Sequence, residues 1–214
     1  MEPKRPRQTR ERILTTALAM FNEFGEHSVA TTSIAFEMGI SPGNLYYHYH
    51  SKDEIVRDLF DQFRREIEAT LAAPDERLPN AEDCWLFLHL VFEAIAKYRF
   101  IYRDLNDLIT RYRFIEVHFR GILAHKQRVA EKILLGLVAN GRMRATGPEI
   151  AALAVNITMM ATYWLSFEYA RDPRGDNGGR VLARGVFHVM SLAAPYLAPK
   201  ERALFDKLAE RYIS

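Results

Sequence analysis

Eight of the nine side chains between residues 44 and 52 have hydrogen-bonding capacity, among them Asn44, Tyr46, Tyr47, His48 and Lys52. An amide such as that of Asn44 can pair with the edge of adenine through two hydrogen bonds, whereas phenol hydroxyls and a lysine ammonium suit phosphate oxygens. We interpret His48 as a phosphate or base contact, and nothing about it suggests catalysis. The group therefore has the chemistry to bind nucleic acid.

Two short helices joined by a turn would position these side chains. Thr31 and Thr32 are suitable N-cap residues for a first helix that runs to Met38. Gly39 can then adopt the left-handed conformation that ends a helix. Ser41 caps the second helix, and the proline after it occupies the first helical position, where a missing N–H costs nothing.

The spacing within the second helix separates a buried face from an exposed one. Leu45 and Tyr49 lie four residues apart, so both should pack inward against the first helix. The remaining outer face is polar and aromatic, which predicts a helix-turn-helix that enters DNA. We expect DNA contacts from Thr31, Thr32, Gly43, Asn44, Tyr46, Tyr47, His48 and Lys52.

The helix that follows begins with a capping signal. Ser51 and Glu54 have the spacing of a capping box, in which the side chain of each residue accepts a hydrogen bond from the backbone N–H of the other. Lys52 then lies near the free N–H groups of the helix start, a place suited to a phosphate. We therefore expect Lys52, together with Tyr47, to bind the DNA backbone without reading its sequence.

The region from Thr32 to Glu54 closely resembles the DNA-binding module of the tetracycline-repressor (TetR) family of bacterial regulators. Gly-Ile-Ser-Pro-Gly-Asn-Leu-Tyr-Tyr-His-Tyr at 39–49 and Ser-Lys-Asp-Glu at 51–54 carry the resemblance. Arg-Glu-Arg-Ile-Leu at 10–14 and Ala-Leu-Ala-Met-Phe-Asn-Glu-Phe-Gly-Glu-His at 17–27 resemble that family's first helix. The resemblance implies a ligand pocket and a four-helix dimer interface in the rest of the chain.

Net charge restricts how the chain could bind DNA. Its 214 residues include 29 basic and 27 acidic side chains, a net charge of +2, so it is not a polycation that coats nucleic acid. The first twelve positions contain five basic residues and two acidic ones, so this segment is locally positive. Pro3 and Pro6 should keep its beginning extended. The segment is either a solubilising tail or an arm that lies along phosphates or in a minor groove.

Helical periodicity dominates the sequence, and we expect an all-α protein. The predicted helices are 8–24, 31–38, a short helix from 42, 52–71, 81–97, 101–111, 115–140, 148–169, 180–196 and 200–212. They form an N-terminal three-helix helix-turn-helix DNA-binding domain, residues 1–52, and a C-terminal helical ligand-binding and dimerisation domain, residues 53–214.

Aromatic residues concentrate between residues 85 and 119 and again between 163 and 167. Most should fill a core, but their density also suits an apolar cavity with a few polar groups, and the family resemblance implies a pocket in this half. We expect a small organic effector to bind among Trp85, Phe92, Tyr98, Tyr102, Tyr112, His118, Phe119, Tyr163 and Trp164.

A single recognition helix covers too few base pairs for genomic selectivity, so a homodimer on a near-palindromic double-stranded DNA operator is expected. Apolar residues in helices 148–169 and 180–196 suggest the interface: Val155, Met159, Thr162, Phe167, Val186, Phe187, Met190 and Leu197. Ligand binding would change the separation of the two recognition helices through the helix from Lys52. The alternative is a DNA-binding regulator controlled by a protein partner, with no small-molecule pocket.

Enzymatic activity is not expected, because the sequence has no Gly-rich phosphate loop, Gly-x-Ser-x-Gly elbow or Cys-x-x-Cys pair. His118 and His125 lie seven residues apart, with Glu116 and His89 possible neighbours, but they lack the tight spacing of metal ligands. We therefore expect neither a metal nor another cofactor.

A cytoplasmic protein is expected. Cys84 is the single cysteine, which excludes an intrachain disulfide and fits a reducing compartment, and no signal peptide is evident at the N-terminus. The run from Ile150 to Phe167 carries no charge and is long enough to raise the question of a membrane span. Its four Asn, Thr and Ser residues favour a helix buried on several sides.

Overall fold

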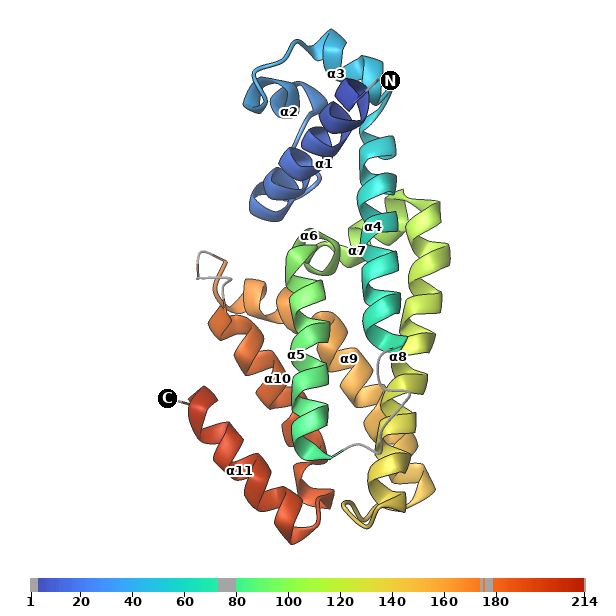
Figure 1. Ribbon diagram of the computed structural model, residues 1–214, viewed down its shortest axis with the longest axis vertical. Helices are drawn as coiled ribbons and strands as arrows, with labels where there is room; N and C mark the ends of the chain where they lie inside the picture. Colours follow the sequence, from blue (N-terminus) through green and yellow to red (C-terminus); the bar gives the residue numbers. More distant parts are fainter. Residues whose placement is uncertain (1–3, 73–79, 174, 176–178, 214) are drawn as a thin grey trace. The chain divides into compact units, whose positions relative to one another are not determined.

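The computed structural model describes residues 4–72, 80–173, 175 and 179–213. Within these ranges the regular structure is helical, apart from an isolated bridge between Met143 and Leu197, which confirms the all-α prediction (Figure 1). The helices are α1 Lys4–Phe24, α2 Thr31–Glu37, α3 Pro42–His48, α4 Lys52–Ala72, α5 Ala81–Lys97, α6 Arg99–Arg103, α7 Leu105–Arg111, α8 Arg113–Ala139, α9 Gly147–Arg171, α10 Gly179–Ala193, the 3-10 helix η2 Ala194–Tyr196 and α11 Pro199–Ile213.

The N-terminal segment differs from its prediction. Helix α1 begins at Lys4, so Pro6 is helical rather than extended. A proline is tolerated there because the first N–H groups of a helix have no intrahelical partner to lose. Pro3 lies outside the described residues, and whether the basic segment contacts DNA stays a prediction.

The predicted helix 101–111 is instead two helices, α6 and α7. They are separated at Asp104, whose backbone lies outside the helical region at φ −110° and ψ 24°. Its N–H still donates to the Phe100 carbonyl at 3.1 Å, and its carboxylate accepts from the Arg103 guanidinium. Charge periodicity alone did not indicate this break.

The chain forms two compact units, each with its own core. The first unit comprises residues 1–65 and 98–118, and the second comprises 66–97 and 119–214. In the first unit α1, α2 and α3 pack against one another, and α1 also packs on α6 through Phe21 and Phe100, whose rings lie 5.4 Å apart. The predicted boundary at residue 52 divides the chain by function, into a DNA-binding and a ligand-binding part, and not by compactness. The two units therefore do not test it, and it stays a prediction.

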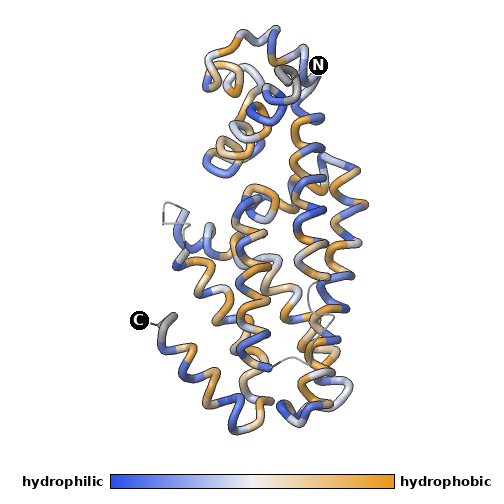
Figure 2. The backbone as a smooth tube through the Cα atoms, viewed as in Figure 1, coloured by the Kyte–Doolittle hydropathy of each residue, from blue (hydrophilic) through white to orange (hydrophobic). Residues whose placement is uncertain are grey.

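In the second unit, α10 packs closely against both α5 and α9. Gly185 permits this approach, because a Cβ at that position would lie 2.5 Å from the Phe92 ring and 2.8 Å from the Trp164 ring. The Trp164 indole also donates to the Val181 carbonyl at 2.8 Å. Hydrophobic and hydrophilic residues alternate along α5, α8 and α11, as expected for helices with one buried face (Figure 2).

Helix α9 contains the charge-free run, and by length and composition alone it could cross a membrane. In the fold, 44% of its most apolar 18-residue window is buried, and α10 packs along it. The core helix of a water-soluble protein passes the same compositional test. Packing within the second unit thus accounts for part of the apolar composition of α9.

Candidate DNA-binding face and ligand cavity

The turn between α2 and α3 has the predicted geometry at its C-terminal side. Gly39 has a φ of +66°, in the left-handed region, and the Ser41 hydroxyl accepts a hydrogen bond from the Asn44 N–H at 3.2 Å. The prediction for the start of α2 was wrong, because Ala30 is the N-cap and makes no side-chain capping bond. Thr31 and Thr32 lie in the first turn instead, so capping does not occupy their hydroxyls.

Helix α3 has the predicted inner and outer faces. The side chain of Leu45 is 1% exposed and that of Tyr49 is fully buried, whereas Tyr46 is 49% exposed and Tyr47 is 76% exposed. Asn44 is also exposed. We name the outer set Gly43, Asn44, Tyr46, Tyr47 and His48 the recognition face.

Tyr49 anchors the recognition face from behind. Its hydroxyl donates to the Asp58 carboxylate at 2.8 Å and accepts from the Arg10 guanidinium at 3.0 Å. Arg10 also pairs with Asp58 at 2.8 Å. Because these three residues come from α1, the end of α3 and α4, they hold the recognition helix in a defined orientation.

One aromatic residue near this face was missed by the sequence analysis. Phe36, on α2, is 86% exposed, more than any other large apolar side chain in the described ranges. Single exposed apolar side chains are common on protein surfaces, so this exposure makes Phe36 available for a contact but assigns it no role by itself. The sequence did contain a signal for this exposure, because Phe36 follows Ile34 and Ala35, the two residues that form the buried face of α2.

Lys52 lies on a buried carboxylate that sequence reasoning also missed. The side chain of Glu26 has no exposed surface, and the Lys52 ammonium lies 2.9 Å from its carboxylate and 3.1 Å from its backbone carbonyl. Arg111 pairs with the same carboxylate, and the Tyr112 hydroxyl donates to it at 2.8 Å. Burial by itself would raise the pKa of Glu26, but the bonds from Arg111, Lys52 and Tyr112 outweigh it and lower that pKa.

This network ties three parts of the first unit together. Glu26 follows α1, Lys52 begins α4, and Arg111 ends α7. The Ser51 hydroxyl accepts from the Glu54 N–H at 3.3 Å, as predicted, whereas the Glu54 carboxylate accepts from the His50 N–H at 2.9 Å instead of the Ser51 N–H of a capping box. Tyr112, expected to face a ligand, instead has its hydroxyl on Glu26.

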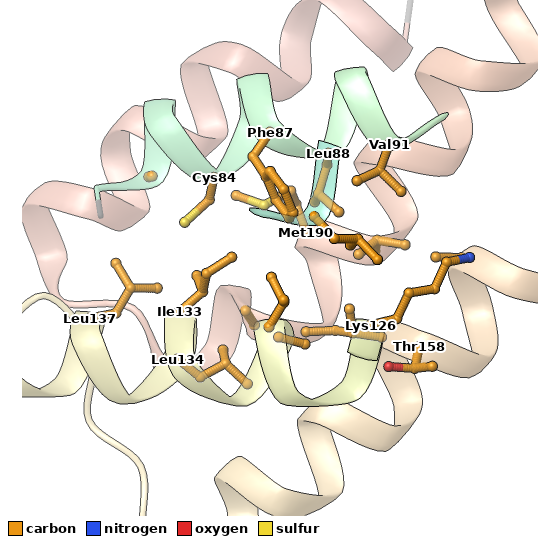
Figure 3. Close-up of a pocket in the computed structure, with 18 of the residues that line it drawn as sticks. Cys84, Phe87, Leu88, Val91, Lys126, Ile133, Leu134, Leu137, Thr158 and Met190 are labelled. Carbon is orange, nitrogen blue, oxygen red and sulfur yellow. The ribbon is translucent and has the colours of Figure 1, made fainter. Parts of the chain in front are cut away.

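The second unit contains a narrow cavity of about 70 Å³ between α5, α8, α9 and α10 (Figure 3). We call it the Lys126 cavity. Its walls are almost wholly apolar, which makes it suited to a hydrocarbon ligand. The side chains that form these walls include Phe87, Leu88, Val91, Ile133, Leu134 and Met190.

Three side chains with an N–H, O–H or S–H group line the same cavity. Lys126 is only 5% exposed, and burial lowers the pKa of its ammonium to about 7. The Thr158 hydroxyl is buried and has no hydrogen-bond partner among the described residues. Burial raises the pKa of the Cys84 thiol to about 12, which makes it an unreactive wall residue. Within the same ranges, no three His, Cys, Asp or Glu side chains gather to hold a metal.

None of the nine residues expected to line a pocket lines the Lys126 cavity, although all nine lie in described parts of the chain. Tyr98 and Tyr102 belong to the first unit, where both pack on Phe63 at ring distances of 5.6 and 5.5 Å. His118, also in the first unit, is exposed. Tyr98, Tyr102 and Tyr112 are core or network residues in this fold, and effector contact by them stays a prediction.

The other expected pocket residues are in the second unit. Trp85 donates to the His89 imidazole at 3.0 Å, and Phe92 and Phe119 are fully buried. Tyr163 and Trp164 line a separate surface groove on α9 and α10. Phe92 and Phe119 are thus packed core, whereas the walls of the Lys126 cavity are mainly aliphatic, and an aliphatic sequence pattern is the same whether or not the side chains touch.

An apolar stripe on α9 borders that groove. Val155, Met159, Tyr163 and Phe167 recur every four residues and are between 42% and 58% exposed. The predicted interface set needs correction, because Thr162, Val186 and Met190 are buried within this chain and belong to its core. Glu168, 5% exposed, pairs with Arg171 at 2.7 Å and with Arg184 at the edge of the groove.

Comparisons with known proteins match both parts of the chain. A family model described as bacterial regulatory proteins, tetR family, matches residues 13–59, and a second, described as the TetR bacterial transcriptional repressor, matches 62–205. The HTH-type transcriptional repressor KstR2 of Mycobacterium tuberculosis is 31% identical over 188 residues, which cover 83% of this chain and 86% of that protein.

Solved structures show the same fold. The crystal structure of a TetR-family transcriptional regulator from Marinobacter aquaeolei VT8 is 29% identical, with a TM-score of 0.85 over 95% of this chain and 98% of that one. The structure of the ketosteroid transcriptional regulator KstR2 of M. tuberculosis has a TM-score of 0.68 at 21% identity, over 89% of this chain and 95% of that one. This second likeness concerns the fold alone.

Proposed function

The chain belongs to the TetR family of bacterial transcriptional repressors, and on that premise we propose that it is a ligand-responsive repressor that acts as a homodimer on a near-palindromic operator. The observation that carries this proposal is α3. Its recognition face is exposed and hydrogen-bonding, while Leu45 and Tyr49 fix its orientation from behind. A helix so anchored can enter a major groove without first becoming ordered.

We assign different roles to the residues of the recognition face. Asn44 lies in the first turn of α3 and reads a base, because the N-terminal residues of a recognition helix reach the base edges. Tyr47 binds the DNA backbone through its hydroxyl, and Gly43 allows close approach. The hydroxyls of Thr31 and Thr32, with Tyr46 and His48, complete the contact surface.

Lys52 has a double role in this proposal. An ammonium has three donors, and two of them point to the carboxylate and carbonyl of Glu26. A third donor remains for a phosphate, and the side chain is 25% exposed. Lys52 therefore links the buried network to the DNA backbone.

Dimerisation would bury the α9 stripe. Val155, Met159, Tyr163 and Phe167 form a continuous apolar surface, which a two-fold partner can cover with the same surface. The dimer would act in the cytoplasm, where the operator is. The same residues from both protomers would then meet around the symmetry axis.

The Lys126 cavity is the proposed effector site. Leu71, near the end of α4, lines the cavity, and Lys52 begins that same helix. A ligand that widens the cavity would displace α4 and thereby change the position of Lys52. If the ligand binds the displaced position of α4 more tightly than the DNA-binding position, it stabilises the displaced one. DNA affinity then falls by at most the ratio of the two ligand affinities.

Selection from a random DNA library tests the proposal, followed by footprinting and light scattering of the free protein and the complex. We expect two inverted half-sites with centres about 34 to 36 Å apart, or a multiple, bound by an even number of chains. A single half-site bound by one chain would contradict the homodimer. Operator binding that no compound in a broad apolar panel alters would favour control by a protein partner.

A further inference from the structure

We propose that the Lys126 cavity binds an uncharged, unbranched hydrocarbon chain, which it selects by shape and apolar contact without a polar anchor. The inference rests on the proposed function, because it gives the effector of that site a chemical class. Figure 3 shows the cavity between α5 and α8, with Leu137 near one end of the labelled group and Lys126 near the other.

The polarity of the walls is the first argument. In Figure 3 the nitrogen of Lys126 points away from Cys84, Ile133 and Leu137, so this residue contributes mainly the carbon atoms of its side chain to the wall. Lys126 also has an interaction of its own in the fold. The Thr158 hydroxyl is itself buried, and a thiol such as that of Cys84 is a weak donor. A charged ligand group would therefore lose its water without gaining a partner from the described lining residues.

The shape of the cavity is the second argument. Its wall on α8 extends from Lys126 to Leu137, about 16 Å along the helix, and its wall on α5 extends from Ala81 to Val91, about 15 Å. A volume of about 70 Å³ between walls of this length is narrow, which suits a single chain and not a ring system or a branched carbon skeleton. The chain must still displace some wall side chains, of which the flexible Met190 is the best suited to move.

Filling this space with hydrocarbon is favourable because the walls offer water too few partners. A buried water needs about two to four hydrogen bonds, and an apolar cavity of about 150 Å³ lined by Leu, Ile and Phe stays dry and binds benzene or xenon. A hydrocarbon that enters such a cavity gains dispersion contacts and displaces no tightly bound water. Its binding should be enthalpy-driven at room temperature, with a negative change in heat capacity.

Isothermal titration calorimetry on the full chain tests this class without DNA. The probes are 1-butanol, 1-hexanol and 1-octanol, each paired with the carboxylate of the same carbon number. Affinity for the alcohols should rise about fourfold for each added CH₂, because each CH₂ leaves water for an apolar wall. Each carboxylate should bind at least tenfold more weakly than its alcohol, because an ionised group costs far more to bury than a hydroxyl.

A branched isomer tests the shape. The compound 3,3-dimethyl-1-butanol has the composition of 1-hexanol but a wider carbon skeleton, so it should bind at least tenfold more weakly. The comparison requires no variant, and it holds the number of carbon atoms constant. Equal affinity for the two isomers would show that the site does not select a straight chain.

A filled cavity tests the location. Ala130 is buried in the wall on α8, so Ala130→Leu should occupy the space and reduce affinity for 1-octanol at least tenfold. Ala124→Leu is the matched control, because Ala124 is an exposed alanine of the same helix, and it should change nothing. Leucine and alanine have similar helix propensities, so both variants should preserve α8. Thermal unfolding confirms that each variant is folded.

Two further variants test the absence of a polar anchor. Lys126→Met and Thr158→Val keep the approximate shapes of the side chains and remove their polar atoms. Each should change the affinity for 1-octanol by less than about threefold, because neither polar atom faces the ligand in this proposal. A loss of tenfold or more in a folded Lys126→Met chain would show that the ammonium binds the ligand.

The inference is also overturned if no straight-chain alcohol binds, if a carboxylate binds as tightly as its alcohol, or if a folded Ala130→Leu chain keeps full affinity. Operator binding, measured separately, distinguishes this failure from failure of the proposed function. Alcohols that bind in the cavity but leave operator affinity unchanged support the ligand class and contradict ligand-responsive repression. A charged compound that releases the operator, where the alcohols do not, does the reverse.

Discussion

The Lys52 ammonium lies 2.9 Å from the carboxylate of Glu26, a side chain with no exposed surface. Lys52 begins the helix α4 that reaches the Lys126 cavity, and Glu26 lies between α1 and α2. The pair therefore connects the start of α4 to the segment between α1 and α2 through a buried charge.

Glu26→Gln should destabilise the protein by about 3 to 5 kcal/mol, because Lys52 and Arg111 would lose a shared buried partner. Urea unfolding monitored by circular dichroism at pH 7 measures the change. Glu23→Gln is the matched control, because Glu23 is an exposed glutamate of α1 and should cost under about 0.5 kcal/mol. Similar stability of the two variants would show that the network contributes little.

The same variant predicts a pH dependence. The folded-state pKa of Glu26 is below its ordinary value of 4.5, so the stability it contributes is present above pH 4.5 and is lost as the pH falls through the folded pKa. The stability difference between the natural chain and Glu26→Gln should therefore shrink in acid below that value. Unfolding curves between pH 3 and 7 check this; a difference that grows in acid would contradict it.

Asn44→Ala should relax base preference at one operator position and cost about 1 to 3 kcal/mol there. Its amide is exposed at the first turn of α3, and the N-terminal residues of a recognition helix are the ones that contact base edges in this motif. A binding-site selection with each protein measures the preference. Tyr47→Phe is the comparison, and the loss of its hydroxyl should weaken all sequences about equally. Identical sequence preference of the natural chain and Asn44→Ala would disprove the assignment.

Lys52→Ala should weaken binding to all DNA sequences about equally and lower the salt slope by about one unit, since it would remove the phosphate contact that we propose for Lys52. It should also reduce stability, because Glu26 would lose one of its charged partners. Affinity is therefore measured on protein shown to be folded, over a range of salt concentrations. An unchanged salt slope would show that Lys52 pairs with Glu26 and does not contact a phosphate.

Lys126→Met should raise stability near neutral pH. Burial lowers the folded-state pKa of Lys126 from 10.5 to about 7, so the unfolded chain binds more protons between those values. The free energy of unfolding of the natural chain should consequently rise with pH in that window, by at most about 1.4 kcal/mol per pH unit. Lys126→Met should lack that part of the slope. Urea unfolding at pH 6 to 9 measures both chains, and parallel slopes would show that Lys126 does not titrate there.

Met159→Glu should shift the protein from dimer to monomer, because Met159 lies in the middle of the α9 stripe and is 56% exposed. Two like charges would then meet near the two-fold axis. Analytical ultracentrifugation measures the equilibrium. Leu135→Glu on α8 changes a residue of similar exposure outside the stripe and should leave it unaltered. A dimer that tolerates Met159→Glu would place the interface elsewhere.

Much of the fold was predictable from local patterns. The helix α5 has the predicted bounds, Ala81–Lys97, because apolar residues that recur three and four positions apart specify a helix with one buried face. The inner positions of α3, Leu45 and Tyr49, were also predicted correctly, since the turn through Gly39 and the cap at Ser41 determine where that helix begins. These features depend on residues close together in the sequence.

The partners of buried charges and the location of empty space depended on the tertiary structure. Glu26 and Arg111 are 85 residues apart, and no local pattern relates them. A lysine such as Lys126 would be assigned to the surface from the sequence, and it is buried only because α5, α9 and α10 pack around it. Periodicity indicates which side chains turn inward, but whether they touch depends on the shapes of all the helices that meet there. For this reason the sequence alone determined the DNA-binding helix and its outward face, and only the packing of distant helices decided the cavity.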